Sequence, residues 1–332
     1  MRKLVLYLAL LLITGVQTAK AQGGYVATDW ETAAEEKAAQ AQIQVPPIAK
    51  GDHVFYICND MGRNGYYEQK TIARLMGNMA KLTGLQFVAA LGDVHHFEGV
   101  ASVDDPLWMT NYELIYSHPE LMLPWYPILG NHEYRGNTQA VLDYAKKSRR
   151  WEMPSRYYAK TVKIGKEKAL LLFIDTAPLL DKYREKSDVY PDAGKQNREA
   201  ELAWIENELK TSDAKWKIVM GHHPVFADTN KAEAERLDMQ KYLKPLLDKY
   251  KVDIYICGHI HNFQHIRPKG SKTVYLVNSA ASLSRPNVKP IDGTVFCSGE
   301  AGFTVADLSE NALHFFLMNG KGKIIHQIDI KK

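Results

Sequence analysis

Five short polar segments, each directly after an apolar run typical of a buried strand, constrain this chain more than any other feature. Each segment combines glycine with aspartate, asparagine or histidine, and these polar residue types ligate metal ions. A sheet can bring side chains from several strand ends to one point, so the pattern indicates a site for two metal ions. The segments are Asn59-Asp60-Met61-Gly62, Gly92-Asp93, Gly130-Asn131-His132-Glu133, Gly221-His222-His223 and Gly258-His259-Ile260-His261.

The apolar runs predict buried strands, and helical periodicity fills several of the gaps between them. Three apolar stripes, within residues 72–79, 202–209 and 237–250, predict helices. Beyond residue 273 strands and turns dominate, so we expect an α/β fold with a β-rich C-terminal portion. The expected strands are His53–Cys58, Gln86–Leu91, Trp125–Leu129, Ala169–Ile174, Trp216–Met220, Asp253–Cys257 and Thr273–Val277, followed by a hairpin of Ala312–Met318 and Lys323–Ile330.

The first 21 residues have the pattern of a secretory signal peptide. A charged start, Arg2-Lys3, precedes the apolar run Leu4–Ile13, and Ala19-Lys20-Ala21 is a cleavage site of the A-x-A type. We therefore expect an exported, periplasmic or secreted protein whose mature chain begins at Gln22. A membrane anchor is the alternative, but the apolar run is short for a span, and no other segment is apolar enough to cross a membrane.

The rest of the chain divides into an N-terminal extension, residues 22–50, and a main domain, residues 51–332. The extension is polar, and we expect one helix over Trp30–Gln42. The formal net charge is +4, but residues 1–21 hold three basic residues and no acidic one. The remainder has 39 basic and 38 acidic residues, so no nucleic-acid footprint is expected.

A pair of metal ions needs a shared ligand, and a carboxylate can bridge two cations because it has two oxygens. Asp93 is the candidate bridge. His259 and His261 are two residues apart and would face opposite sides of an extended segment. We therefore expect both on a turn, each serving a different ion.

The order of these segments resembles that of the calcineurin-like metallophosphoesterases, and within them the small purple acid phosphatases of the tartrate-resistant type. The resemblance runs from about Val54 to the C-terminus. The first segment reads Asp-x-Gly, and Trp125–His132, Gly221–Phe226 and Cys257–Gln264 follow the pattern of that subgroup. It implies a four-layer α/β/β/α sandwich and makes residues 51–332 a metallophosphoesterase catalytic domain.

The resemblance also implies which residues hold the metals. One ion would take Asp60, Asp93, the residue at position 96 and His261. The other would take Asp93, Asn131, His222 and His259. Asp93 and His132 would be the catalytic residues, and His132 would contact the phosphate and help to protonate the leaving group.

Position 96 departs from the family, which has a tyrosine whose phenolate binds ferric iron and gives the purple colour. A neutral imidazole at His96 suits divalent iron, zinc or manganese better than Fe(III). We therefore expect two divalent ions and no purple colour. The alternative is that His96 is not a ligand and one ion lacks a donor.

The residues expected to bind the substrate differ from those of the family as well. Lys231 replaces a second substrate histidine of the family, and His223 replaces a tyrosine. Lys231, His223 and His95 are candidates for binding the substrate. The alternatives are a solvated lysine at 231 and an exposed loop histidine at 95.

The expected function is hydrolysis of small phosphomonoesters by direct attack of a metal-bound hydroxide at phosphorus. Two divalent ions would make the bound water less acidic than Fe(III) would, so we expect a pH optimum nearer neutral than the family name suggests. Phosphodiester or nucleotide hydrolysis at the same site is one alternative. A non-catalytic protein that binds metal or phosphate is another, and redox chemistry at an iron pair is a third. The oligomeric state does not follow from the sequence.

Overall fold

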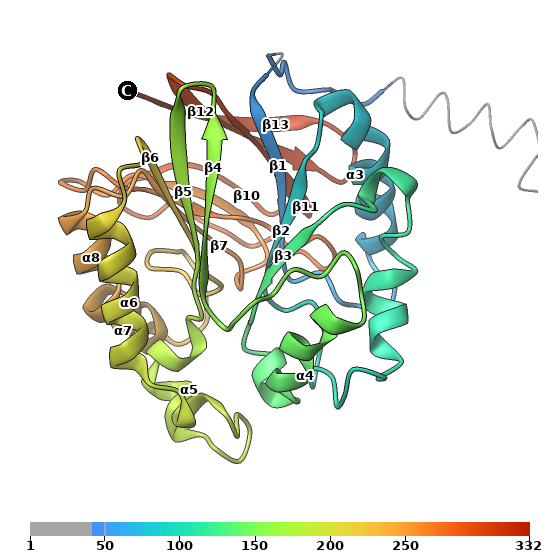
Figure 1. Ribbon diagram of the computed structural model, residues 1–332, viewed down its shortest axis with the longest axis vertical. Coiled ribbons are helices and arrows are strands. Elements are labelled where there is room, and N and C mark those ends of the chain that lie inside the picture. The colour runs from blue at the N-terminus through green and yellow to red at the C-terminus, as the bar shows by residue number, and fades with distance from the viewer. Residues whose placement is uncertain (1–41, 50) are drawn as a thin grey trace, which may run out of the picture. The chain divides into compact units, whose positions relative to one another are not determined.

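Two mixed β-sheets carry the fold in the computed structural model, which describes residues 42–49 and 51–332 (Figure 1). The expected signal peptide and nearly all of the helix expected over residues 30–42 lie outside the described residues. Gln44–Lys332 form one unit. Within the described residues, no helix has the length and apolarity that a bilayer span requires.

The first sheet has six strands in the order β13-β12-β11-β1-β2-β3. Strands β1, β2 and β3 run parallel, whereas β11, β12 and β13 pair antiparallel and extend the sheet on the β1 side. The strands are β1 (His53–Cys58), β2 (Phe87–Leu91), β3 (Trp125–Ile128), β11 (Gly302–Leu308), β12 (Ala312–Asn319) and β13 (Ile324–Lys331).

The second sheet has seven strands in the order β10-β8-β9-β7-β6-β5-β4. Its centre, β5, β6, β7 and β9, is parallel. The strands are β4 (Tyr158–Ile164), β5 (Glu167–Phe173), β6 (Trp216–Met220), β7 (Ile254–Cys257), β8 (Phe263–Ile266), β9 (Val274–Val277) and β10 (Thr294–Ser298).

Helices cover the outer faces, with α3 on the side of β1–β3 and α6, α7 and α8 on the opposite side (Figure 1). Between the sheets, Tyr126 of β3 lies 5.9 Å from Phe173 of β5, measured between ring centroids. The predicted α/β fold with a β-rich C-terminal portion is confirmed. The helices are α3 (Gln69–Thr83), α4 (Thr138–Asp143), α5 (Asp181–Glu185), α6 (Arg198–Thr211), α7 (Glu233–Tyr242) and α8 (Lys244–Lys249).

All the predicted strands are present, with ends that differ by at most two residues. The stripe over residues 237–250 is two helices rather than one, because Pro245 lies in the first turn of α8 and lacks the N–H that a continuous helix needs. Four strands were not predicted. β4 alternates buried and exposed residues, β8 carries buried polar side chains, β10 is a partly exposed edge strand, and β11 contains Gly302 and Asp307.

Candidate metal centre

The polar segments lie where strands end. Asp60 follows β1, Asp93 follows β2 and Asn131 follows β3 in the first sheet. His222 follows β6 and His259 follows β7 in the second sheet. Within each sheet these strands are parallel, so their carboxyl ends share one edge, where α/β proteins commonly bind ligands.

Four of the candidate ligands have a left-handed backbone: Asp60 (φ 50°), Asp93 (φ 53°), His259 (φ 70°) and His261 (φ 65°). Positive φ is uncommon outside glycine, and only seven non-glycine residues of the described chain have it. Backbone strain of this kind persists where surrounding contacts over-determine it, and it concentrates at functional sites. His259 and His261 lie in the turn between β7 and β8, as predicted.

Two glycines allow the strand ends to approach one another. Gly92 has a φ of 82°, and a Cβ there would lie 2.7 Å from His222 Nδ1. A Cβ at Gly130 would collide with the Asp93 carboxylate. A larger residue at position 92 would therefore collide with His222 of the second sheet, and one at position 130 would displace Asp93 within the first sheet.

Asp93 lies at the centre of the group and is buried. Its Oδ2 atom lies 3.2 Å from His222 Nε2, 3.6 Å from His96 Nε2 and 3.8 Å from His132 Nε2. Its Oδ1 atom accepts a hydrogen bond of 2.9 Å from the His132 backbone N–H. Asp93 therefore contacts residues from three loops, as a bridging ligand would.

Asp60 forms a second group of contacts beside Asp93. Its Oδ1 atom lies 3.0 Å from His261 Nε2. Its Oδ2 atom accepts hydrogen bonds of 2.7 Å from both the His259 backbone N–H and the Asn59 side chain. Because Oδ2 is held by these donors, Oδ1 is the oxygen left to face a cation.

The imidazoles are oriented by backbone carbonyls. Nδ1 of each ring lies within hydrogen-bond distance of a carbonyl oxygen: His96 of Gly62 (3.1 Å), His132 of Phe97 (2.7 Å), His222 of Leu91 (2.8 Å) and His261 of Leu283 (2.6 Å). A proton on Nδ1 leaves the Nε2 lone pair facing the carboxylates. Histidines that bind metals are commonly held in this way.

The electrostatics match a cation site. Burial alone would raise the pKa of Asp60 and Asp93, but the facing histidines outweigh it and hold both well below the ordinary value. Burial would lower the pKa of His222, but the Asp93 carboxylate outweighs it and raises this pKa to about 9. A proton on His222 thus supplies positive charge beside Asp93.

A third group of contacts surrounds His259. Its Nε2 atom lies 3.0 Å from Oε2 of Glu235, a buried residue of α7. Lys231 Nζ donates a hydrogen bond of 2.6 Å to the His259 carbonyl and lies 3.1 Å from its Nδ1. His223 joins His222 and His259 in one buried cluster, and Thr176 Oγ1 lies 2.8 Å from His223 Nδ1. Lys231 and His223 therefore both lie at the centre.

Asn131 and His95 complete the predicted set. Asn131 lies between two residues that contact Asp93, and its buried Oδ1 has no hydrogen-bond partner among the described residues. His95 is buried, with its ring 4.4 Å from that of Trp108 and its Nδ1 3.4 Å from Asn111. The structure does not bring His95 into the ligand clusters of the described chain.

The donor atoms fit divalent transition metals. The buried atoms Asp60 Oδ1, His96 Nε2, Asn131 Oδ1 and His222 Nε2 have no hydrogen-bond partner among the described residues. Imidazole nitrogen and carboxylate oxygen are suitable ligands for zinc, manganese and ferrous iron. Groups whose ligand atoms lie within 4.8 Å of one another are Asp60-His96-His261, Asp93-His96-His132, Asp60-Asp93-His222 and His222-His223-His259.

Sequence reasoning missed residues that support the centre. Glu133 accepts hydrogen bonds from the backbone N–H groups of Gly130, Asp93 and His95, so it ties two strand ends together. It was visible in the third polar segment as a residue without a role. Glu235 had no motif to mark it.

The chain matches known phosphoesterases over most of its length. The family model for the calcineurin-like phosphoesterase matches residues 53–263. Purple acid phosphatase 4 of Arabidopsis thaliana is 32% identical over 303 residues, which cover 88% of this chain and 87% of that protein. Tartrate-resistant acid phosphatase type 5 of Oryctolagus cuniculus is 30% identical over 222 residues, which cover 65% of this chain and 67% of that protein.

Solved structures show the same fold. GAP50, the anchor in the inner membrane complex of Plasmodium, aligns with a TM-score of 0.72 at 23% identity over 85% of this chain and 89% of its own. The purple acid phosphatase PPD1 of yellow lupin (Lupinus luteus) aligns with a TM-score of 0.60 at 17% identity over 85% of this chain and 54% of its own. The sequence matches show that the chain belongs to the calcineurin-like phosphoesterase family, as a metal-dependent hydrolase similar to the purple acid phosphatases.

Proposed function

We propose that this protein hydrolyses small phosphomonoesters at a centre that holds two divalent metal ions. The observation that carries the proposal is the buried Asp93 carboxylate, which faces the Nε2 atoms of His222, His96 and His132 at 3.2–3.8 Å. Burying charged and polar groups without partners is costly. Cations between these groups would satisfy them together.

Each ion would have its own ligands besides the shared Asp93. The first would be held by Asp60, His96 and His261, and the second by Asn131, His222 and His259. When bound, the two ions would polarise a phosphate oxygen and make a water molecule more acidic. The chain supplies the rest: it orients the imidazoles through backbone carbonyls and excludes bulk water by burial.

His132 is the proposed proton donor. The Phe97 carbonyl oxygen lies within hydrogen-bond distance of its Nδ1, and its Nε2 faces the Asp93 carboxylate. Its side chain is 13% exposed, whereas those of His96 and His222 are at most 1% exposed. A histidine that reaches the surface beside the ligands can contact both a phosphate oxygen and the leaving group.

His96 is the proposed ligand in place of the family tyrosine. Its ring is buried beside Asp93 and held by Gly62 O, which favours ligation over the alternative of a missing donor. A neutral imidazole supports divalent ions, and a pH optimum nearer neutral follows.

Lys231 is proposed to bind the phosphate, because its ammonium lies against His259 at the rim of the centre. His223 is proposed to lie deeper beside His259, since its buried Nε2 has no hydrogen-bond partner among the described residues. His95 is the third residue proposed for the substrate side, and its neighbours are Trp108 and Asn111.

Two other functions compete. Phosphodiester or nucleotide hydrolysis could use the same groups, and comparing nitrophenyl phosphate with bis(nitrophenyl) phosphate separates it from monoester hydrolysis. A non-catalytic role is the second, since an anchor protein shares the fold. The full set of candidate ligands, together with a partly exposed His132 beside them, favours catalysis over binding alone.

Export is proposed from the sequence pattern, with residues 1–21 as signal peptide, residues 22–50 as extension and residues 51–332 as catalytic domain. If this is right, protein recovered from outside the cytoplasm begins at Gln22 on N-terminal sequencing. An intact Met1 on the recovered protein would argue for an uncleaved anchor instead.

Metal affinity should depend on pH through His222. Its pKa of about 9 in the metal-free protein means that a proton must leave before a metal binds. We expect zinc affinity to weaken by about tenfold per pH unit on going from pH 8.5 to pH 6.5. Competition titration with a chelator measures this. A histidine with an ordinary pKa would give a nearly constant affinity above pH 7.5, and that result would contradict the assignment.

Substituting His132 should separate catalysis from metal binding. His132→Gln is expected to lower kcat for nitrophenyl phosphate by about 100- to 10,000-fold, while elemental analysis still finds two ions per chain. His314→Gln, on β12, serves as the control. Loss of metal in His132→Gln would show that His132 has a structural role instead.

Restoring the family residue should restore the colour. Wild-type protein loaded with iron is expected to show no purple band, whereas His96→Tyr should show one because its phenolate can bind Fe(III). His95→Tyr is the matched control, since His95 is adjacent in sequence but outside the ligand clusters. A colourless His96→Tyr protein with full iron content would mean that position 96 does not ligate.

A further inference from the structure

We propose that Arg285 recognises a second oxyanion on the substrate. The preferred substrates would then be small polar phosphomonoesters whose leaving group carries a carboxylate or a second phosphate. This inference rests on the proposed phosphomonoesterase function and names the substrate class for the same centre.

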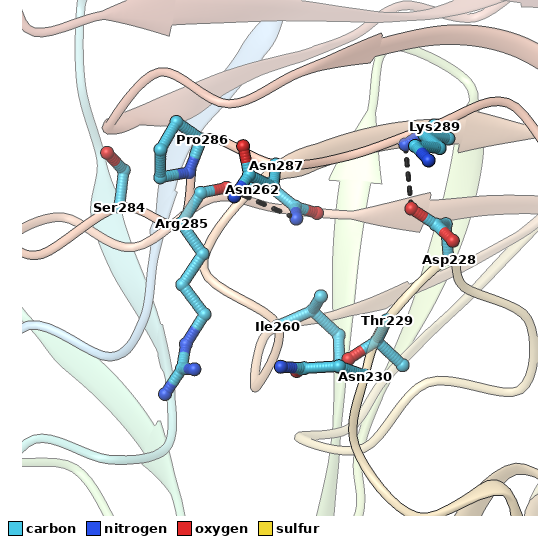
Figure 2. A pocket seen from close by; sticks show the side chains of 10 residues that line it. All are labelled: Asp228, Thr229, Asn230, Ile260, Asn262, Ser284, Arg285, Pro286, Asn287 and Lys289. Atoms are coloured by element: carbon cyan, nitrogen blue, oxygen red, sulfur yellow. Dashed lines mark hydrogen bonds between the residues drawn. The ribbon is translucent and has the colours of Figure 1, made fainter.

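A cavity of about 490 Å³ adjoins the candidate metal centre (Figure 2). Its wall shares a chain segment with the centre, because Ile260 lies between His259 and His261 in the sequence. The Arg285 backbone N–H also donates a hydrogen bond of 2.7 Å to the His261 carbonyl. On the other side, Asn230 precedes Lys231, whose ammonium contacts His259. A leaving group could therefore extend from the centre into this cavity.

Most of the residues that line the cavity have polar or charged side chains. Only Ile260 and Pro286 contribute apolar side chains. Ligand pockets that bind apolar groups are lined mainly by hydrophobic and aromatic residues, so this cavity suits a small, hydrogen-bonding leaving group. The residues that offer uncharged polar side chains are Thr229, Asn230, Asn262, Ser284 and Asn287.

Arg285 is one of two cationic residues that line the cavity, and its backbone is the one bonded to His261 of the centre. In Figure 2 its side chain extends away from Pro286, whereas Asp228 and Lys289 lie together elsewhere in the cavity, joined by a hydrogen bond from Lys289 N to Asp228 Oδ2. The Arg285 guanidinium is exposed and makes no hydrogen bond or ion pair within the part of the chain that the structure describes. Its planar donors match the geometry of carboxylate and phosphate.

Besides Arg285, two further cationic side chains lie near the centre. Lys231 and Arg63 lie beside it, and Arg63 stacks on Phe97 with its guanidinium carbon 4.7 Å from the ring centroid. Clustered cations of this kind attract substrates with additional negative charge.

A second cavity could hold the leaving group instead. It has a volume of about 420 Å³, opens beside His96 and is lined by Arg63 and by the exposed rings of Tyr66, Tyr67 and Phe97. That surface would suit an aromatic leaving group instead. A protein that uses it would prefer aryl phosphates, and its kcat/KM values would not depend on Arg285.

The test compares two substrates that differ in one group. 3-Phosphoglycerate has a terminal carboxylate where glycerol 3-phosphate has a hydroxymethyl group. For the metal-loaded full-length protein, we expect kcat/KM to favour 3-phosphoglycerate by about 10- to 100-fold, the range of a hydrogen bond to a charged group. In Arg285→Gln this ratio should fall to about one, and Arg285→Lys should give an intermediate ratio.

Two controls show whether the preference comes from direct contact with Arg285 or from the overall positive charge of the cavity. Lys289→Gln removes the same charge from the same cavity and should keep the ratio within about twofold of the wild-type value. Metal content and melting temperature show whether Arg285→Gln is folded. A second pair, propanediol bisphosphate and propanediol monophosphate, shows whether phosphate replaces carboxylate as the preferred oxyanion.

The outcomes are distinct. If the wild-type protein hydrolyses glycerol 3-phosphate and nitrophenyl phosphate but shows no preference in either pair, the Arg285 inference is wrong and the proposed function stands. An equal loss of preference in Lys289→Gln would also overturn it. If the metal-loaded wild-type protein hydrolyses none of these monoesters, the proposed function itself fails.

Discussion

The buried contact between the Asp93 carboxylate and three imidazoles joins the two halves of this fold. Its partners come from loops that follow β2, β3 and β6, so one side chain links the edges of both sheets. A carboxylate removed from water is unfavourable unless it is paired. Glycines at positions 92 and 130 permit the close approach that the pairing needs. The geometry of the candidate metal centre therefore depends on this contact.

Much of the fold could be predicted because its central strands are buried on both faces. Such strands appear as continuous apolar runs, and β1 and β6 were predicted to the residue. The missed strands lack a continuous, fully buried apolar run. β8 buries Gln264 and His265, so its sequence does not look apolar. β4 alternates between polar and apolar residues because one of its two faces is exposed.

The candidate site was predictable for a related reason. Ligands at strand ends follow strong apolar runs, so each polar segment stands out in the sequence. Residues that act on the ligands from elsewhere have no such marker. Glu235 reaches His259 from α7, and Thr176 reaches His223 from the loop after β5, both through contacts between distant parts of the chain. Spacing within one sequence carries no information on those contacts.

The carbonyl groups that orient His96, His132, His222 and His261 belong to the main chain, which every residue type possesses. Exchanging the side chains of Leu91 or Leu283 would leave these acceptors in place. Inserting or deleting a residue in the loops would move them. Variation in loop length, more than exchange of single residues around the ligands, should therefore decide how the reactivity of this centre diverges between relatives.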